Sequence, residues 1–487
     1  MSKSKRKAKK VSKTLKIVSS IFGITLLIVN ILLFYIIFEL NVIPTKYFTI
    51  ICCVLLPILI ILEIFLTIPK IKSNIKKVAI GISTVFIILI SIILYYLYNT
   101  NGFLNKFRFK NYQIESFYVI SLKNNGYEKL DDLNNSSIGI LDQDDKEYKE
   151  ALKKIDDKIN ADYKNNDNAE NLIYDLFNDD IDAIILDDNY KDYADEQIEG
   201  FTNKTFVVYT VEIKTEKKDI SKKVDVSRES FNIYISGIDT SGDITNVSRS
   251  DVNMIMTVNP NTGKMLLTSI PRDYYVQLHG TTGRKDKLTH SGTYGINMTT
   301  QTVEDLLGID INYYIRVNFT TLIKLVDKLG GIDVYSDKGF TPWTNTAIYI
   351  PKGNVHMNGE MALAFARERH AYTEGDRHRV QNQQDVLEAV FKKLTKTSTL
   401  VSSYTGILDT LDGSFETNMS KDTITSLAKF QINKMPSWNI EKISVNGSDS
   451  SNYTYSYPGQ KLYVMEPDMQ TVTEASNKIK DVLGKKE

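Results

Sequence analysis

Three long apolar segments occupy the first hundred residues, and the sequence that follows them is polar and charged. The segments 17–38, 47–68 and 78–98 each contain about 20 residues, enough for a helix to cross a bilayer core of about 30 Å. The first and third carry no charged residue, whereas the second contains Pro57 and Glu63. Glu63 lies near one end of its segment, where its carboxylate can reach the polar interface. The pattern therefore predicts three transmembrane helices.

Basic residues flank these segments unevenly. The leader, residues 1–16, and the loop 69–77 are rich in lysine, whereas the loop between the first two segments carries only Glu39 and Lys46. By the positive-inside rule, the leader and the loop 69–77 are cytoplasmic. Three crossings then place everything after about residue 99 outside the cell. We therefore expect a multi-pass cell-membrane protein with a cytoplasmic N-terminus and extracellular C-terminal domains.

The segment 110–220 alternates between short strand and helix patterns. Strands are predicted at 117–122, 137–141 and 181–186, and helices at 148–159 and 169–177. This order favours a small α/β accessory domain with a partly parallel sheet. Acidic residues outnumber lysines about two to one in this segment. The domain is either a spacer or sensor that meets a partner, or a solvated acidic domain without a ligand, and the charged stretch 214–223 is expected to link it to the next domain.

Residues 230–487 have the pattern of a larger α/β domain. Strands are predicted at 231–235, 252–258, 264–270 and 313–317, and helices at 300–307, 320–329, 359–365 and from 376 onward. Strands of this kind with helices between them predict a three-layer α/β/α domain with a mixed central sheet.

The composition of the chain excludes several classes of protein. The chain of 487 residues carries 59 basic and 59 acidic residues, so its net charge gives no reason to expect nucleic acid as a partner. Its only cysteines, Cys52 and Cys53, lie inside the second apolar segment, which excludes a disulfide framework and a cysteine-based zinc site. The five histidines have no zinc-binding spacing.

Arginine and aspartate recur where the predicted elements of the large domain end. They are Arg249, Asp251, Arg272, Asp273, Arg367, Arg369, Asp376 and Arg379, with Asn382 and Gln383 one turn further on. Ligands of open α/β sheets bind beyond strand ends, and the planar fork of arginine matches phosphate oxygens. Two carboxylates beside such a cluster suit Mg²⁺. The cluster is either a phosphoryl-transfer site that works by positioning and charge neutralisation, or a surface of solvated salt bridges.

Several strings in this region together resemble the LytR-CpsA-Psr family, over about residues 230–394. They are Gly237–Asp239, Ser248–Asp251, Ser269–Asp273, Lys287–His290, Tyr313–Phe319, Leu329–Val334, Ala362–Arg369 and Gly375–Gln383. Three apolar segments followed by an acidic domain further resemble the capsule-locus, CpsA-like branch of that family.

The resemblance implies a cell-wall glycopolymer ligase of Gram-positive type. Such an enzyme transfers a phosphoglycan, of the capsular polysaccharide or teichoic acid kind, from a polyprenyl-pyrophosphate carrier to peptidoglycan. Its implied cofactor is Mg²⁺, with Mn²⁺ as the alternative ion. Capsule-assembly proteins are possible further partners at the membrane. The alternatives are a membrane-anchored regulator or scaffold of capsule synthesis, and a hydrolase of the lipid pyrophosphate.

The resemblance also implies roles for individual residues. Asp239 and Asp251 would bind the metal ion, Asp376 would be the base for the acceptor hydroxyl, and Asp273 would only orient Arg272. The pyrophosphate would be held by Arg249, Arg272, Arg367, Arg369, Arg379 and Gln383. Asn382 stands where many relatives have arginine, so one phosphate contact is expected to be missing or replaced.

Overall fold

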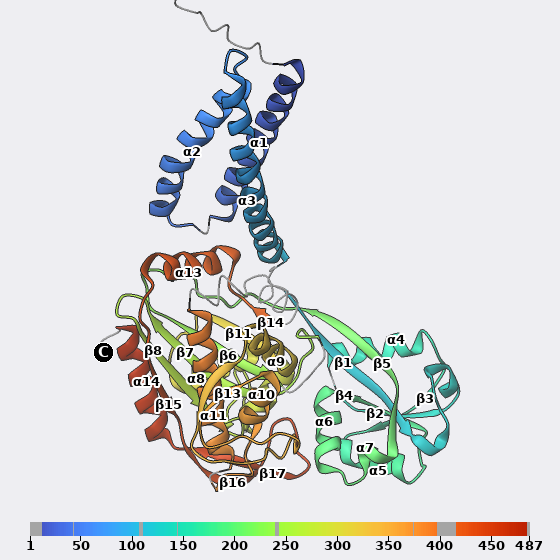
Figure 1. The fold of residues 1–487 in the computed structure, drawn as a ribbon. Helices are drawn as coiled ribbons and strands as arrows, with labels where there is room; N and C mark the ends of the chain where they lie inside the picture. The colour runs from blue at the N-terminus through green and yellow to red at the C-terminus, as the bar shows by residue number, and fades with distance from the viewer. Residues whose placement is uncertain are drawn as a thin grey trace, which may run out of the picture. The chain divides into compact units, whose positions relative to one another are not determined.

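The computed structural model describes residues 12–41, 43–106, 111–143, 145–238, 243–373, 375–396 and 415–484 (Figure 1). The chain divides into two compact units. One contains the N-terminal helices and residues 420–436, and the other contains the accessory domain and most of the larger α/β domain.

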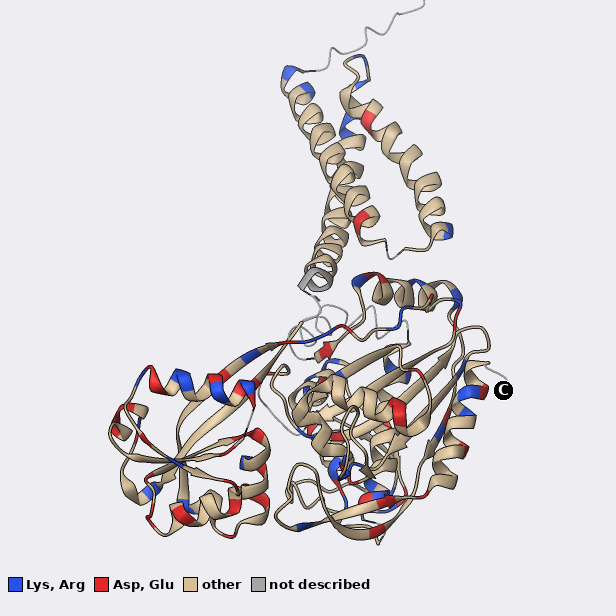
Figure 2. Cartoon of the chain, turned by 180° about the vertical axis from the view of Figure 1, so that it is seen from behind, with Lys and Arg blue, Asp and Glu red and all other residues tan. Residues whose placement is uncertain are grey.

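The three predicted membrane helices are present as α1 (Lys13–Leu40), α2 (Thr45–Thr67) and α3 (Ser73–Lys106). All three are long and apolar enough to cross a membrane. Charged residues gather toward the ends of these helices and leave their central parts apolar (Figure 2). Lys76 of α3 donates to the carbonyl oxygen of Leu66 at 2.6 Å, which satisfies one of the carbonyl groups left open where α2 ends.

A fourth helix, α13 (Lys421–Lys434), belongs to the same unit. Ile424 of α13 packs with Ile36 and Leu40 of α1, and Lys429 donates to the side chain of Asn41 at 2.5 Å. Part of the range 230–487 therefore groups with the apolar helices.

The accessory domain is a five-stranded sheet in the order β3-β2-β4-β1-β5. Its elements are β1 (Tyr112–Leu122), β2 (Ser137–Leu141), α4 (Lys146–Asp156), β3 (Asp162–Asn166), α5 (Ala169–Phe177), β4 (Ala183–Asp187), α6 (Asp188–Gln197), α7 (Phe201–Lys204) and β5 (Thr205–Glu216). Strand β2 is parallel to β3 and β4, and β1 is antiparallel to β4 and β5, so the sheet is partly parallel as expected.

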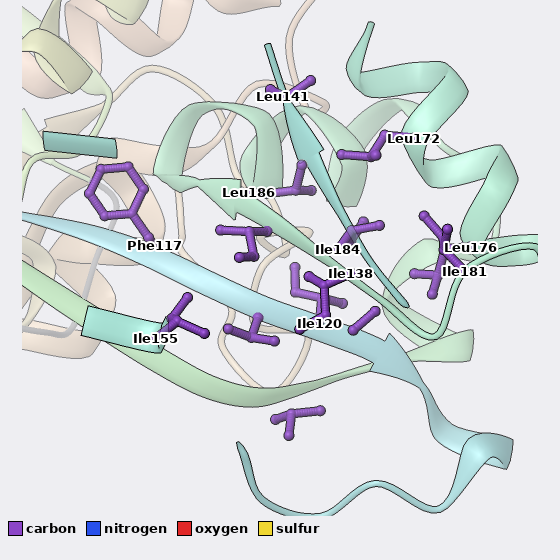
Figure 3. Close-up of a cluster of buried hydrophobic side chains, with 14 of the residues drawn as sticks. Phe117, Ile120, Ile138, Leu141, Ile155, Leu172, Leu176, Ile181, Ile184 and Leu186 are labelled. Carbon is purple, nitrogen blue, oxygen red and sulfur yellow. The ribbon is translucent and has the colours of Figure 1, made fainter. Parts of the chain in front are cut away.

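Buried aliphatic residues from both faces of this sheet form one core (Figure 3). Ile184 and Leu186 of β4 are fully buried, as is Ile138 of β2. Strand β3 was not predicted because its sequence, Asp-Tyr-Lys-Asn-Asn, has no apolar alternation and pairs only as an edge strand.

The stretch 214–223 differs from the expected linker. Its first three residues complete β5, and Lys217 follows with its side chain buried rather than solvated. The Lys217 ammonium pairs with the carboxylate of Glu416, which is equally buried and also lies 3.6 Å from Arg316. The sequence around Lys217 does not indicate that its partner is Glu416, almost two hundred positions away.

The larger domain has the predicted three layers around a mixed sheet, in the order β14-β11-β6-β7-β8-β15. These strands are β6 (Phe231–Ile238), β7 (Ser250–Asn259), β8 (Lys264–Ile270), β11 (Tyr313–Asn318), β14 (Phe415–Thr417) and β15 (Asn439–Ser444). Helices α8 (Ile296–Leu307) and α14 (Met469–Leu483) pack on one face through a shared apolar core. Helices α9 (Phe319–Lys328), α10 (Gly359–Arg367) and α11 (Asp376–Leu394) cover the other (Figure 1).

Shorter elements surround this sheet. They are β9 (Tyr275–Val276), β10 (Asp286–Lys287), the 3₁₀ segment η3 (Leu288–Tyr294), β12 (Ile332–Ser336), β13 (Gly353–Met357), β16 (Gly447–Tyr453) and β17 (Lys461–Pro467).

Replacing Ile184 by alanine tests the core of the accessory domain. Ile184→Ala leaves a cavity between β4 and its neighbours, and should lower the free energy of unfolding of this domain by about 2–5 kcal/mol. Hydrogen exchange of the full-length protein should then be faster in β1–β5 and unchanged in β6–β8. Tyr174→Ala is the control, because that side chain is 53% exposed. Equal protection of β4 in both variants would contradict the role of Ile184 in this core.

Candidate active site

Three strand ends meet at one edge of the larger sheet. Ile238, the last residue of β6, pairs with Ser250 at the start of β7, and Asn253 pairs with Ile270 at the end of β8. Residues just outside these positions are therefore neighbours in space. A guanidinium nitrogen of Arg272 (Nη1) lies 2.8 Å from Oδ1 of Asp251, so the two residues form an ion pair.

The backbone around Arg272 is held by a turn. Pro271 follows β8, and its carbonyl oxygen accepts from the amide of Tyr274, which places Arg272 and Asp273 at the two central positions. The carbonyl oxygen of Arg272 accepts from the amide of Thr289 at 2.8 Å, and that of Asp273 accepts from the amide of Met465 at 2.7 Å. The Thr289 hydroxyl also donates to Oδ1 of Asp251. This segment is thus fixed by contacts with η3 and β17.

Lys287 is a member of the site to which the sequence assigned no role. Its ammonium donates to Oδ1 of Asp273 at 3.1 Å, whereas Nε of Arg272 is 4.0 Å from the same oxygen. Burial raises the pKa of Asp273, but Lys287 and Arg272 outweigh burial and hold this pKa below its ordinary value. Burial lowers the pKa of Arg272, and the carboxylates of Asp251 and Asp273 outweigh it, so this pKa is raised. Both groups therefore stay charged in the folded protein.

The first turn of α11 contains a second ion pair. Gly375 precedes it with φ of 54°, a left-handed conformation that glycine adopts without strain. Nη2 of Arg379 lies 2.6 Å from Oδ1 of Asp376, as expected for residues three apart on one helix face. Arg379 is also among the cations that lower the pKa of Asp273, which connects α11 to the turn of Arg272.

Asn382 makes a hydrogen bond within the protein. Its side chain is buried, and its amide nitrogen donates to the carbonyl oxygen of Phe365 at 3.0 Å. It thereby fastens α11 to α10. Gln383, the next residue, is half-buried.

Arg367 and Arg369 contact aromatic rings. The guanidinium of Arg367, in the last turn of α10, lies 4.6 Å from the ring centre of Phe319. Arg369 follows the end of that helix, is exposed, and lies 5.3 Å from the ring of Trp343. The contacts described above instead join Asp251, Arg272, Asp273 and Lys287 to one another, and Asp376 to Arg379. Arg272 and Arg379 thus have acidic partners, whereas Arg367 and Arg369 lie beside aromatic rings.

Arg249 is buried just before β7, and its contacts were not predicted. Its Nη1 lies 2.5 Å from a carboxylate oxygen of Glu196, and its Nε lies 3.6 Å from Asp192; both acids belong to α6 of the accessory domain. Arg249 is close enough to Arg272 for the two positive charges to repel each other. Gly292 of η3 allows this packing, because a Cβ there would lie 2.4 Å from the carbonyl oxygen of Ser248.

Within the described part of the chain, four buried guanidinium nitrogens have no hydrogen-bond partner. One is Nη2 of Arg316, whose Nη1 pairs with Glu416, and the other three are the Nε atoms of Arg249, Arg272 and Arg379. A buried donor without an acceptor costs about 1–3 kcal/mol, and more when it is charged. Three such donors on neighbouring arginines indicate a site for an anion with several oxygen atoms, such as a phosphate or pyrophosphate.

The fit of a metal ion rests on Asp251. Asp239 lies outside the described residues, and within the described ranges no group of three or more histidine, cysteine or acidic residues is placed to hold a metal. Mg²⁺ in phosphoryl-transfer sites uses one or two carboxylates, with phosphate oxygens and water as its other ligands. The contacts of Asp251 with Arg272 and Thr289 both involve Oδ1, so its Oδ2 suits such an ion.

The fold and this site define a membrane-anchored α/β protein with a cluster of arginine and aspartate at one edge of its larger sheet. The chain belongs to the LytR_cpsA_psr family, whose sequence profile matches residues 200–477. This finding confirms the resemblance drawn from the motifs.

Named relatives come from Bacillus. The polyisoprenyl-teichoic acid–peptidoglycan teichoic acid transferase TagU of Bacillus mycoides is 37% identical over 220 residues, which are 45% of this chain and 69% of the relative. TagT of Bacillus subtilis, a transferase of the same name, is 32% identical over 274 residues, 54% of this chain and 80% of the relative. The crystal structure of B. subtilis TagV is 30% identical and has a TM-score of 0.45, over 53% of this chain and 99% of that one.

Arg379 and Arg377 on the same helix give a matched test of the anion site. Arg379→Ala should weaken binding of inorganic pyrophosphate by about tenfold or more, because a charge-assisted hydrogen bond is worth about 1.5–3 kcal/mol. Arg377→Ala should leave it within about twofold, because Arg377 is exposed and pairs with Asp449. Calorimetric titration of the purified protein measures both affinities. Equal loss in the two variants would contradict an anion site at Arg379.

Proposed function

We propose that this protein transfers a phosphoglycan from a polyprenyl-pyrophosphate carrier to peptidoglycan. The relatives TagU and TagT are named as transferases of polyisoprenyl-linked teichoic acid to peptidoglycan. The observation that carries the proposal is the set of three buried Nε donors on Arg249, Arg272 and Arg379. A pyrophosphate offers enough oxygen atoms to accept from all three.

In the proposed reaction, the arginines bind and orient the pyrophosphate. Arg272 is held in two ways, because Asp251 pairs with its side chain and hydrogen bonds hold the backbone of its turn. Charges preorganised in this way stabilise negative charge that builds up on the phosphate oxygens during transfer. The ion pair between Lys287 and Asp273 helps to hold the turn that carries Arg272.

Asp376 is the proposed general base. Its contact with Arg379 leaves one carboxylate oxygen for the acceptor hydroxyl and fixes the direction in which that oxygen points. Asp376 takes the proton of the hydroxyl as the new bond between acceptor oxygen and phosphorus forms. The bond between phosphorus and the bridging oxygen breaks, and the polyprenyl phosphate leaves.

Asp251, with Asp239, is the proposed holder of Mg²⁺ or Mn²⁺. When bound, the ion supplies further neutralisation of the phosphate charge. We propose that the same carrier also contacts Arg367, Arg369 and Gln383, further from Arg272 and Arg379.

The distribution of lysine around the apolar helices supports this function. We infer that the lysine-rich ends of α1, α2 and α3 are cytoplasmic, which places the catalytic domain at the outer face of a Gram-positive cell membrane. Lipid-linked glycopolymer and peptidoglycan are both found there. The cargo is proposed to be capsular polysaccharide or teichoic acid, with capsule-assembly proteins as further partners.

Asp376→Asn tests the proposed base. The amide preserves the size of the side chain but cannot accept the proton, so kcat for transfer should fall by about 10²–10³-fold, a typical cost of removing one transition-state contact. The assay combines full-length protein in detergent with a lipid-linked oligosaccharide and peptidoglycan oligomers. A covalent glycan–peptidoglycan product supports transfer, whereas free phosphorylated glycan alone would identify a hydrolase. Unchanged kcat would exclude Asp376 as the base.

Removal of divalent ions tests the proposed cofactor. A chelator should abolish product formation, and Mg²⁺ or Mn²⁺ added in excess should restore it, because the phosphate charge is otherwise only partly neutralised. Asp251→Asn should raise the Mg²⁺ concentration that gives half-maximal rate. Full activity in the presence of chelator would show that the reaction needs no divalent ion.

A further inference from the structure

The accessory domain contributes two acidic side chains to Arg249 of the larger domain. Glu196 and Asp192 lie one helical turn apart on α6, so both carboxylates face the same way. Glu196 meets Nη1 of Arg249 at 2.5 Å, and Asp192 lies 3.6 Å from its Nε. The side chain of Arg249 is only 8% exposed, so this ion pair is largely shielded from solvent on the arginine side.

Further contacts hold α6 beside Arg249. The hydroxyl of Tyr457 donates to the carbonyl oxygen of Asn189 in α6 at 2.5 Å, and its ring stacks on Tyr193 at 4.8 Å between centres. Gln460 donates to the hydroxyl of Tyr193. Tyr457, Tyr193 and Gln460 thus join α6 to the segment before β17, in addition to the ion pair.

The loop that carries Arg249 is held by the accessory domain as well. The amide of Ile114 in β1 donates to the carbonyl oxygen of Thr245, and the amide of Val247 donates back to Ile114, both at 2.9 Å. Strand β1 therefore fixes the backbone just before Arg249, while α6 fixes its side chain. An arginine side chain has about 2 kcal/mol of rotamer entropy to lose, so anchoring it beforehand favours ligand binding.

We propose that Glu196 and Asp192 are positioning residues for the pyrophosphate site, and that the accessory domain is a working part of this site. The proposal rests on the proposed function. Glu196 holds one nitrogen of a guanidinium that has five N–H donors, so other donors remain for an anion. The Nε of Arg249 is one of them, because it makes no hydrogen bond and its contact with Asp192 is long, at 3.6 Å. Because Glu196 is itself 53% exposed, water screens its charge and limits its repulsion of the ligand.

Variants of Glu196 in the full-length protein test this role. Glu196→Ala should raise KM for the lipid-linked donor, and the dissociation constant of inorganic pyrophosphate, by about tenfold with kcat changed less than about threefold, because it removes one charge-assisted contact. Glu196→Gln retains an acceptor oxygen and should recover most of the affinity. Glu199→Ala, an exposed acid just beyond α6, is the matched control and should behave as the native protein.

A double-variant cycle separates positioning from a general loss of fold. In an Arg249→Ala background, Glu196→Ala should have no further effect on either constant, because the group that it positions is gone. Additive effects in the two backgrounds would overturn the proposal. So would tighter binding by Glu196→Ala, since that result would make the acid a competitor of the ligand.

Product formation and pyrophosphate binding, measured separately, distinguish this proposal from the proposed function. If the native protein forms no glycan–peptidoglycan product but Glu196→Ala still weakens pyrophosphate binding, the transfer reaction is wrong and the positioning role stands. If the native protein is active and Glu196→Ala matches Glu199→Ala in both constants, only the positioning role is wrong.

Discussion

The cost of burying guanidinium groups is the constraint that the arginine cluster of the larger domain has to meet. Burial disfavours the charge of Arg249 and of Arg272, and the charge of Arg249 adds to that cost at Arg272. Each is held by a carboxylate: Asp251 for Arg272 and Glu196 for Arg249. These acids compensate the charge without using every N–H donor, and the Nε atoms of both arginines make no hydrogen bond.

Much of the fold follows from local patterning. Strand β8 begins and ends as expected because its apolar run lies between a glycine turn and Pro271, and α11 begins at Asp376 because Gly375 ends the preceding segment. The pairing of Asp376 with Arg379 was also accessible, since it depends only on helix geometry. Strand β3 was missed because a polar edge strand is stabilised by backbone pairing rather than by apolar burial.

The parts of the site that could not be predicted are contacts between distant positions. Lys287 and Asp273 are brought together by the turn after β8, and Glu196 reaches Arg249 across a domain boundary. Neither pair has a periodicity or a motif of its own. The acidic composition of the accessory domain suggested a solvated surface, yet two of its carboxylates, on one face of α6, contact Arg249. Average composition does not indicate which carboxylate faces which arginine.

The buried pair of Lys217 and Glu416 limits how the accessory domain can evolve or be exchanged. Both charges are almost fully shielded, so leaving either one alone costs about 3–5 kcal/mol. Lys217 immediately follows β5, and Glu416 lies in the edge strand β14 of the larger sheet. A chimera that takes its accessory domain from one relative and its catalytic sheet from another must therefore inherit both residues together. The end of β5 is therefore joined to the larger sheet by a fixed, buried contact and is not a flexible linker.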